Sequence, residues 1–426
     1  MNPLFEKIAQ FVKNNCQADD YTLNIDLGDS HETRFAQNAI TQHIAGPSLN
    51  ISLEVAFGQQ TGSCRVNQGD EETLKHLIRT AEGIARYNRP DPEYMPSIGL
   101  QELPKVNNCD PETRDLAPEK MVEIVGKSID QAKTWGAMVS GMTEKHLWEM
   151  GLFTKNGFAG YDTNTTFGHS MTLKKDAVET KVSYSAKDFG GFSLEQELQR
   201  LGSQADSLAD LHDFDPEKIP VILRPSAWEE LLWFMAWMMN RRQSDEGFTP
   251  YTGKLGEAFF GPKFSLRSTL KEPRLSASPW DLEGIACKEI SWVENGVLKN
   301  LPTNRHWAKE KNTEPISIYN FYIPGEGTSE EEMMAMVPRG LIINRFWYIR
   351  TVDAKAGEFT GMTRDGVLYF EDGKIKHAVN NLRFNEIPHD ATRRILALGK
   401  PQLTSSIGMM PTLLIDGFNF VDKTGF

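Results

Sequence analysis

Apolar residues at helical spacing open the chain and then give way to a two-residue alternation. A first helix is predicted because five apolar residues share one face: Leu4, Phe5, Ile8, Phe11 and Val12. Alternating apolar and polar positions then predict strands over residues 21–27 and 49–57, with another strand over 33–42 between them. A second amphipathic helix is expected over residues 74–84, and the N-terminal part, residues 1–88, therefore reads as an α/β domain.

Prolines mark the next boundary. Residues 89–117 carry five prolines, a density that excludes regular structure and predicts a linker or an extended surface strap. Residues 118–215 then form a middle α+β region, with a helix over 118–135 and another over 194–211. Between the helices we expect five short strands, over 137–142, 146–154, 158–162, 168–173 and 180–186, with Asn156-Gly157 as a hairpin turn.

The C-terminal half, residues 216–426, is predicted to be rich in strands. A buried strand over 219–223 leads into a helix over 225–240, and the pattern after Gly247 is largely β. Asn295-Gly296 and Asp372-Gly373 predict two more hairpin turns, and residues 329–336 a short helix. The fold class is α+β, with a mixed or antiparallel sheet in the N-terminal part and a mainly antiparallel, barrel-like C-terminal part.

Composition narrows the classes of function. Lys and Arg total 46 against 58 Asp and Glu, a net charge of −12, which argues against nucleic-acid binding and against docking on anionic lipid. No apolar run approaches the ~20 residues that span a bilayer, and the N-terminus lacks the pattern of a signal peptide. Four scattered cysteines without a CxxC pair favour reduced thiols and a cytoplasmic location.

The sequence carries no obvious catalytic motif. None of the nine histidines forms an HxxxH pair of the kind that zinc peptidases use, and no GxSxG elbow occurs. His306 and Glu310 lie one helical turn apart, so they could share a metal ion or form a surface pair. The Trp- and Met-rich helix over 225–240 could bind peptides through an adaptable face, or could simply be core.

Several segments, taken in order, resemble the TldD/PmbA family, also known as the modulator of gyrase group. The similar segments are Glu32–Gln42, Gly253–Glu257, Trp280–Gly284 followed by Val293–Leu298, Gly357–Gly361 followed by Gly366–Lys374, and Pro411–Asp416. The resemblance covers nearly the whole chain. It implies an N-terminal α/β part, a β-rich C-terminal part and dimers. In the family's best-understood form, a catalytic TldD-type subunit pairs with a PmbA-type (TldE) subunit as a cytoplasmic zinc peptidase that trims peptides or unfolded proteins.

The catalytic subunits of that family carry His-Glu-x-x-x-His on the helix after the strand that opens the C-terminal half, and a cysteine ligand before the closing strand. Here the motif falls on Trp233, Phe234 and Met238, and no cysteine lies between residues 398 and 411. Trp and Phe cannot ligate zinc, and Met is a poor zinc ligand. The chain therefore resembles the non-catalytic PmbA/TldE type. We expect no catalytic residues, no intrinsic peptidase activity and no cofactor in this chain, with zinc only in a catalytic partner.

Two readings of the altered helix stay open at this point. The former metal cleft is either filled by aromatic bulk or kept as an apolar pocket for peptide side chains. If the cleft is kept, an extended peptide could add as a strand beside residues 317–323, with Asn320, Phe321 and Gly325 in the groove.

Three hypotheses about function follow. The first is a non-catalytic subunit that binds a TldD-like catalytic subunit and helps to hold a peptide substrate. The second is a peptidase with an unconventional site built from groups such as His306, Glu310 and His377. The third is a stand-alone homodimeric peptide-binding protein.

Overall fold

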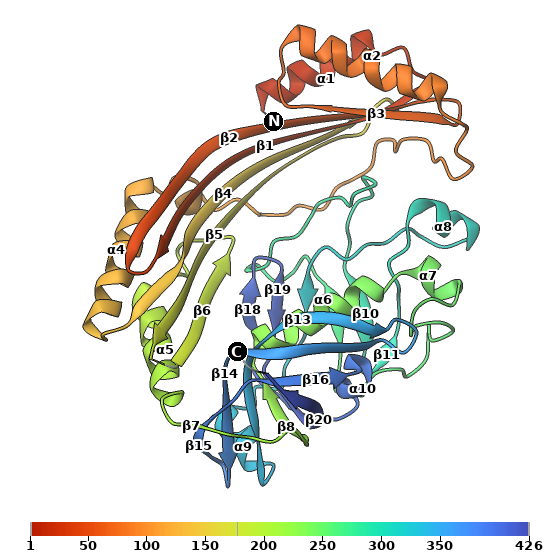
Figure 1. Cartoon of the computed structure of the whole chain (residues 1–426). Helices are drawn as coiled ribbons and strands as arrows, with labels where there is room; N and C mark the ends of the chain where they lie inside the picture. Colours follow the sequence, from red (N-terminus) through yellow and green to blue (C-terminus); the bar gives the residue numbers. More distant parts are fainter. Residues whose placement is uncertain (1, 177, 425–426) are drawn as a thin grey trace.

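A computed structural model describes residues 2–176 and 178–424 of the chain. The fold is α+β, as predicted, and it has a closed barrel in the C-terminal region. Figure 1 shows a long curved sheet that arches over this region.

One six-stranded antiparallel sheet runs through the first 186 residues, in the order β3-β2-β1-β4-β5-β6. Its strands are β1 (Asp20–Ala36), β2 (Ala39–Phe57), β3 (Gln60–Val66), β4 (Met138–Thr154), β5 (Ala159–Lys175) and β6 (Val178–Ala186). Strands of the predicted regions 1–88 and 118–215 are therefore neighbours in a single sheet.

The strands are longer than the sequence indicates. The predicted strands 137–142 and 146–154 are parts of β4, and 158–162 and 168–173 are parts of β5. The alternation weakens in the middle of these strands because the polar side chains there are partly buried, while backbone pairing continues without a break. Hydrophobic periodicity reports burial, and it fails where a paired strand has polar residues on both faces.

The predicted strand 33–42 is wrong because it contains the turn between β1 and β2. Gln37 and Asn38 have φ values of 51° and 60°, the left-handed conformation that a tight hairpin turn requires. The Asn38 side chain fixes this turn to β4, since its Nδ2 donates to the Ala137 carbonyl at 2.8 Å and its Oδ1 accepts from the Val139 N–H at 2.8 Å. Gln is not a typical turn residue, which is why the sequence concealed this hairpin.

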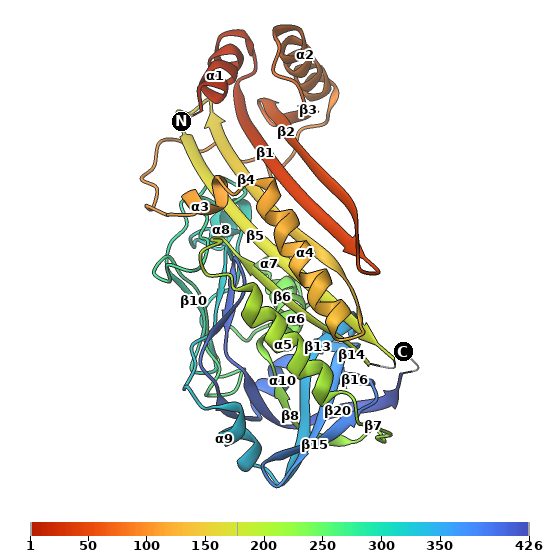
Figure 2. The same ribbon diagram turned by 90° about the vertical axis from the view of Figure 1, so that its left-hand side faces the viewer.

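Helices cover the outer face of the sheet (Figures 1 and 2). α1 (Pro3–Asn15) and α2 (Glu71–Tyr87) pack on one end, and α4 (Pro118–Thr134) and α5 (Leu194–Ser207) on the other. Because side chains alternate along a strand, residues such as Leu23 and Phe35 point toward these helices, while their neighbours Thr22 and Arg34 point to the inner face. α5 ends four residues before the predicted end at 211.

The proline-rich strap, residues 89–117, runs first between the inner face of the sheet and the C-terminal region (Figure 1), and its end, at Arg114 and Leu116, lies on the outer side near the start of α4. Its one short helix among the described residues is α3 (Pro111–Arg114). The buried Asn108 side chain donates to Asp162 of β5 at 2.9 Å and to the Ala277 carbonyl at 2.8 Å, and it accepts from the Ala277 N–H at 3.0 Å. The strap therefore joins the two regions through satisfied hydrogen bonds.

The C-terminal region is built around a closed five-stranded barrel in the order β13-β8-β20-β16-β14, closed by pairing of β14 with β13. Its strands are β8 (Lys218–Leu223), β13 (Arg339–Asp353), β14 (Glu358–Glu371), β16 (Leu382–Glu386) and β20 (Leu413–Lys423). β7 (Leu211–His212), β15 (Lys374–Val379) and β17 (Ile395–Leu398) extend the sheet. The barrel core includes Phe346, Phe384 and Phe418.

A second six-stranded sheet lies beside the barrel, in the order β11-β10-β9-β12-β19-β18. Its strands are β9 (Leu266–Ser268), β10 (Ile290–Glu294), β11 (Val297–Leu298), β12 (Phe321–Tyr322), β18 (Gln402–Ser405) and β19 (Gly408–Met410). The helices of this half are α6 (Pro225–Met238), α7 (Arg241–Asp245), α8 (Arg305–Glu310), α9 (Glu330–Ala335) and α10 (Pro388–Thr392). The turns predicted at Asn295-Gly296 and Asp372-Gly373 are confirmed, since all four residues have positive φ.

The first part of β2 forms an edge of the large sheet. β3 pairs with β2 only from Ile51 to Phe57, so residues 39–50 of β2 are paired with β1 alone. Residues 39–48 are exposed, including Ile40 and Ile44.

Across the described residues, every helix is too short or too polar to cross a lipid bilayer.

A glycine in β3 lets α2 approach the sheet closely. A Cβ at Gly62 would lie 2.4 Å from the Ala81 carbonyl oxygen and 2.4 Å from the Ala85 nitrogen, both backbone atoms of α2. We expect Gly62→Ala to lower the free energy of unfolding by about 1–3 kcal/mol, because backbone cannot move aside cheaply. Denaturant unfolding followed by circular dichroism measures this change.

Gly83→Ala, in α2 itself, is the matched control. A Cβ at Gly83 meets nothing within 4 Å, so this substitution should be neutral or stabilise by up to about 1 kcal/mol. Equal unfolding midpoints for the two variants would contradict the close approach of α2 to β3.

Candidate functional site

Helix α6 holds the positions at which the TldD/PmbA resemblance places a metal motif. It begins at Pro225, directly after the barrel strand β8, and ends at Met238. The Trp- and Met-rich stripe is core, since its side chains are at most 6% exposed: Trp228, Leu231, Leu232, Met235, Met238 and Met239. Of the two readings of this stripe, the structure therefore supports core packing.

The three motif positions all pack against apolar neighbours. Trp233 meets the Phe321 ring edge to face, with ring centroids 4.7 Å apart, and Phe234 meets Phe359 at 5.5 Å. Met238 is 6% exposed and belongs to the main core cluster. Trp233 keeps 45% of its surface exposed, and Trp237, one turn further along, keeps 74%. Aromatic bulk thus fills much of the space beside these positions.

The segment before the closing strand lies against the same helix. Ser405 of β18 donates its hydroxyl proton to Glu229 Oε1 at 2.9 Å. A Cβ at Gly408 would lie 2.4 Å from that same oxygen, so the glycine leaves room for the carboxylate. Burial raises the pKa of Glu229, and the hydroxyls of Ser405 and Thr404 partly offset this effect. The segment in which the resemblance places a cysteine ligand therefore presents hydroxyl groups here.

These residues do not fit a catalytic zinc ion. Such a site needs three nitrogen, oxygen or thiolate donors around an open position. Trp233 and Phe234 offer no donor, and the Met238 thioether is a soft, weak ligand that lies in the core. No metal-dependent step can be assigned to α6.

A polar cleft of about 420 Å³ opens at the start of α6, between strand β6, helix α5 and the barrel. Arg224 donates to both carboxylate oxygens of Glu330, at 2.7 and 3.0 Å, and to Asn344 Oδ1 at 2.5 Å. Arg345 donates to Asp365 at 2.5 Å and to Glu230 at 3.3 Å. The two guanidinium groups are therefore held by fixed acceptors at the wall of the cleft.

Glu230 is the most perturbed carboxyl of this network. Burial raises its pKa to about 7, and the neighbouring Arg345 partly offsets that rise. A carboxyl with a pKa near neutrality can exchange a proton at physiological pH, which is a common property of functional sites. Sequence reasoning missed this cluster because its members come from α6, α9, β13 and β14, which only the fold brings together.

The groove predicted at Asn320, Phe321 and Gly325 has no free edge. β12 pairs with β9 on one side and with β19 on the other. The fully buried Asn320 side chain accepts from the Thr269 N–H at 2.9 Å and donates to the carbonyls of Thr269 and Ser276. A Cβ at Gly325 would lie 2.0 Å from the Gly399 carbonyl oxygen, so the close backbone approach at this glycine is internal. All three residues serve packing.

The histidines considered for an unconventional site are not brought together. His306 and Glu310 lie on α8, whereas His377 lies on β15, where its ring contacts Tyr369 and His212. Across residues 2–176 and 178–424, the one group of three potential metal ligands within 4.8 Å of one another is Glu32, Glu144 and His146.

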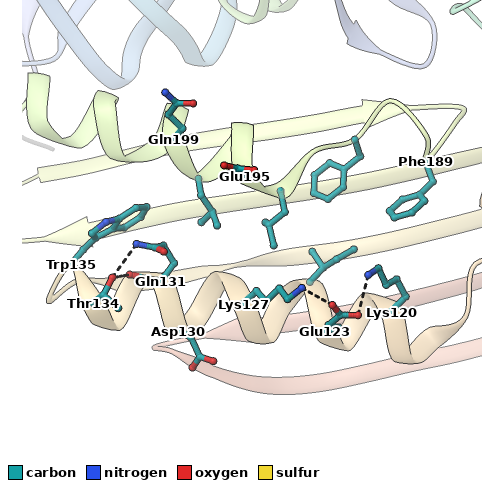
Figure 3. Close-up of a pocket in the computed structure, with 14 residues that line it drawn as sticks. Lys120, Glu123, Lys127, Asp130, Gln131, Thr134, Trp135, Phe189, Glu195 and Gln199 are labelled. Atoms are coloured by element: carbon teal, nitrogen blue, oxygen red, sulfur yellow. Dashed lines mark hydrogen bonds and ion pairs between the residues drawn. The ribbon is translucent and has the colours of Figure 1, made fainter.

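A larger groove of about 770 Å³ lies on the outer side of the sheet, between α4 and α5 (Figure 3). Its floor is apolar, with Ile124, Trp135, Phe189, Phe192, Leu194 and Leu198. On its α4 rim, Lys120 and Lys127 both pair with Glu123, at 3.0 and 2.6 Å (Figure 3). Helix α5 lines both this groove and the polar cleft, through different residues.

Comparison with known proteins agrees with this architecture. Residues 216–422, which contain the barrel, match the family model described as the PmbA/TldA metallopeptidase C-terminal domain. Residues 216–422 therefore form a C-terminal domain of the TldD/PmbA family.

Solved structures share the fold of nearly the whole chain. TldE from Thermococcus kodakarensis is 17% identical, with a TM-score of 0.89 over 98% of this chain and 100% of that one. A proposed modulator of DNA gyrase from Thermotoga maritima is 19% identical, with a TM-score of 0.86 over 98% of this chain and 99% of that one. A corresponding protein from Bacteroides thetaiotaomicron is 18% identical, with a TM-score of 0.84 over 99% of both chains.

Among curated sequences, an uncharacterized protein from Methanocaldococcus jannaschii is 26% identical over 307 residues. The match covers 70% of this chain and 66% of that relative, so the chain spans about two thirds of the relative's length.

The role of Asn320 is open to direct measurement. Asn320→Ala removes a side chain that satisfies three buried backbone groups, so we expect the free energy of unfolding to fall by about 2–3 kcal/mol. Asn300→Ala, which removes a single hydrogen bond to the Ser291 carbonyl, is the control and should cost about 1 kcal/mol. A neutral Asn320→Ala in denaturant unfolding would refute the packing role.

Glu230 should make stability depend on pH. Its pKa is raised from 4.5 to about 7, so between these values the folded chain holds a proton that the unfolded chain has released. Its contribution to stability is therefore present at acidic pH and declines as the pH rises through that window. We expect Glu230→Gln, a mimic of the protonated carboxyl, to match the wild type near pH 4.5 and to melt at a higher temperature at pH 8.

Glu331→Gln, at an exposed carboxyl of α9, is the control and should leave the melting profile unchanged. Parallel pH profiles for Glu230→Gln and the wild type would contradict the perturbed titration.

Proposed function

We propose that this protein is a non-catalytic, TldE-like subunit of a cytoplasmic peptidase complex. The catalytic partner would be a TldD-like subunit that supplies zinc through its own His-Glu-x-x-x-His helix. The substrate would be a peptide or an unfolded protein. One observation carries the proposal: the helix that would hold the catalytic motif presents Trp233, Phe234 and Met238, packed against apolar side chains.

At the three motif positions, helix α6 supplies neither a metal ligand nor a base for the hydrolysis of a peptide bond. Hydrolysis by such a site needs a Lewis acid that activates water and a base that takes its proton. An indole, a phenyl ring and a buried thioether supply neither. The fold is nevertheless complete, with the barrel, the arched sheet and the strap between them, so the chain keeps the shape of a subunit while lacking this chemistry.

The polar cleft is the part of this chain that we assign to substrate holding. Its wall presents Arg224 and Arg345, oriented by Glu330 and Asp365. Oriented guanidinium groups suit a peptide carboxylate or carbonyl oxygen. Arg345 lowers the pKa of Glu230 in the same network, so Glu230 can take up a proton when this guanidinium turns from it to a bound carboxylate.

A direct test is peptidase activity of the purified chain, alone and after co-expression with a TldD-like protein that carries His-Glu-x-x-x-His. We expect no cleavage of unstructured peptides by the isolated chain, with or without added zinc. Cleavage that a chelator abolishes should appear with the partner, and should be lost when the partner's motif is mutated.

The matched control is Trp233→Ala in the same co-expressed pair. Because Trp233 supplies no catalytic group, its loss should leave the chelator-sensitive mechanism in place. Hydrolysis by the isolated wild-type chain would overturn the proposal, and so would failure of the two proteins to associate.

A further inference from the structure

Three potential metal ligands meet on the inner face of the arched sheet, well apart in sequence from α6. They are Glu32 of β1 and Glu144 and His146 of β4. One ligand atom from each lies within 4.8 Å of the other two. Their side chains are 25%, 33% and 19% exposed, so the group is partly shielded yet reachable from solvent.

Strand register produces this group. In the antiparallel pairing of β1 with β4, Glu32 lies directly opposite Glu144, and Ser30 lies opposite His146. Residues two apart on a strand share a face, so both members of the Glu144-x-His146 pair project to the same side. That side is the inner face, because the alternate residue Lys145 reaches the carbonyls of Arg114 and Leu116 near the start of α4.

Neighbouring residues orient the ligands. The His146 Nδ1 atom lies 2.8 Å from Ser30 Oγ, and its Nε2 lies 3.4 Å from Glu144 Oε2. With Nδ1 held by the hydroxyl, Nε2 is directed at the two carboxylates. A partner that fixes one ring nitrogen while the other binds is the usual outer-shell arrangement of metal-ligating histidines.

Gly168 of β5 makes space for one of the carboxylates. A Cβ at this position would lie 2.8 Å from Glu144 Oε1 and 3.0 Å from its Cγ. The glycine therefore forms a recess that the Glu144 side chain occupies, independently of the contacts within the group.

The two carboxylates of this group, on Glu32 and Glu144, would be stabilised by a cation between them. Two carboxylates directly opposite each other on neighbouring strands repel and destabilise the sheet. Arg34 pairs with Glu32 at 3.1 Å and is itself half exposed, and His146 Nε2 lies 3.4 Å from Glu144. A divalent ion between the two carboxylates and the imidazole would replace this repulsion by attraction.

We propose that Glu32, Glu144 and His146 form a binding site for a divalent transition-metal ion such as Zn²⁺ or Mn²⁺. Two carboxylates and one imidazole suit these ions better than Mg²⁺ or Ca²⁺, which prefer oxygen ligands alone. Three protein ligands leave coordination positions for water or for an oxygen of a bound molecule on the inner face. The site is separate from the altered motif of α6 and does not depend on the function proposed above.

The test is metal binding to the full chain after removal of bound metal with a chelator. Zn²⁺ and Mn²⁺ are titrated by calorimetry, and Co²⁺ serves as a spectroscopic probe of the ligand set. We expect one ion per chain and a rise in melting temperature with the ion. Glu144→Gln and His146→Ala should each weaken binding by at least about 10-fold, and Ser30→Ala by about 10-fold through loss of orientation.

His306→Ala and Glu310→Gln in α8 are the matched controls, because they remove the same donor types from a different element. Both should bind the ion as the wild type does. Binding that persists unchanged in Glu144→Gln and His146→Ala would overturn the site, as would the absence of binding by all three ions. Glu144→Gln also removes the charge repulsion, so a folded variant is expected and the result stays interpretable.

Discussion

The unbroken hydrogen-bonded pairing of β1, β4 and β5 is the constraint on which the rest of the structure depends. Each strand is 17 residues long, and their pairing continues from the end covered by α1 and α2 to the end covered by α4 and α5. Alternation along such strands turns apolar residues to the outer face at each end of the sheet and leaves the alternate residues on the inner face. The outer face forms two cores with the helices, and the inner face carries Glu32, Glu144 and His146 and receives the strap through Asp162.

Helix α6 is held in the C-terminal region by apolar packing. The barrel and its extensions hold α6 by packing that does not require a metal ion, since Trp228, Leu231 and Leu232 are fully buried. The polar character of this region persists at the start of α6, where Glu229 meets Ser405 and Glu230 meets Arg345. The helix thus carries Glu229 and Glu230 in its second turn, and the aromatic side chains of Trp233, Phe234 and Trp237 in its second half.

Local patterns were sufficient to predict the longer helices and the turns at Asn295-Gly296 and Asp372-Gly373, because each depends on residues close in sequence, whereas the short helices α3, α7 and α10 were missed. Helix α6 is an example of the longer helices, with Pro225 at its start and large apolar side chains throughout. Strand length was not predictable from periodicity, because polar residues lie on both faces in the middle of β4 and β5. The turn at Gln37 was hidden because its conformation is fixed by Asn38 contacts with β4, a hundred residues away.

Site residues also differ in whether they depend on neighbouring residues or on distant contacts. The resemblance places the family's metal motif on Trp233, Phe234 and Met238, and the absence of nitrogen, oxygen and thiolate donors in these side chains can be read from the sequence. Neither the packing of Asn320 nor the meeting of Glu32 with Glu144 could be read from the chain, since both depend on strand register. The spacing Glu144-x-His146 was the one sign of a metal site in the sequence. It was missed because Glu144 falls between the predicted strands 137–142 and 146–154, which are one strand, β4, in the structure.

The free margin of β2 has a consequence for how this molecule meets its neighbours in a concentrated solution. Residues 39–50 of β2 pair with β1 alone, so their outward N–H and C=O groups can form hydrogen bonds with a strand of another molecule. The exposed side chains of Ile40 and Ile44 add apolar contact area to such pairing. Pro47 limits such association, because it has no N–H and therefore cannot donate a hydrogen bond to a strand added along this edge of β2.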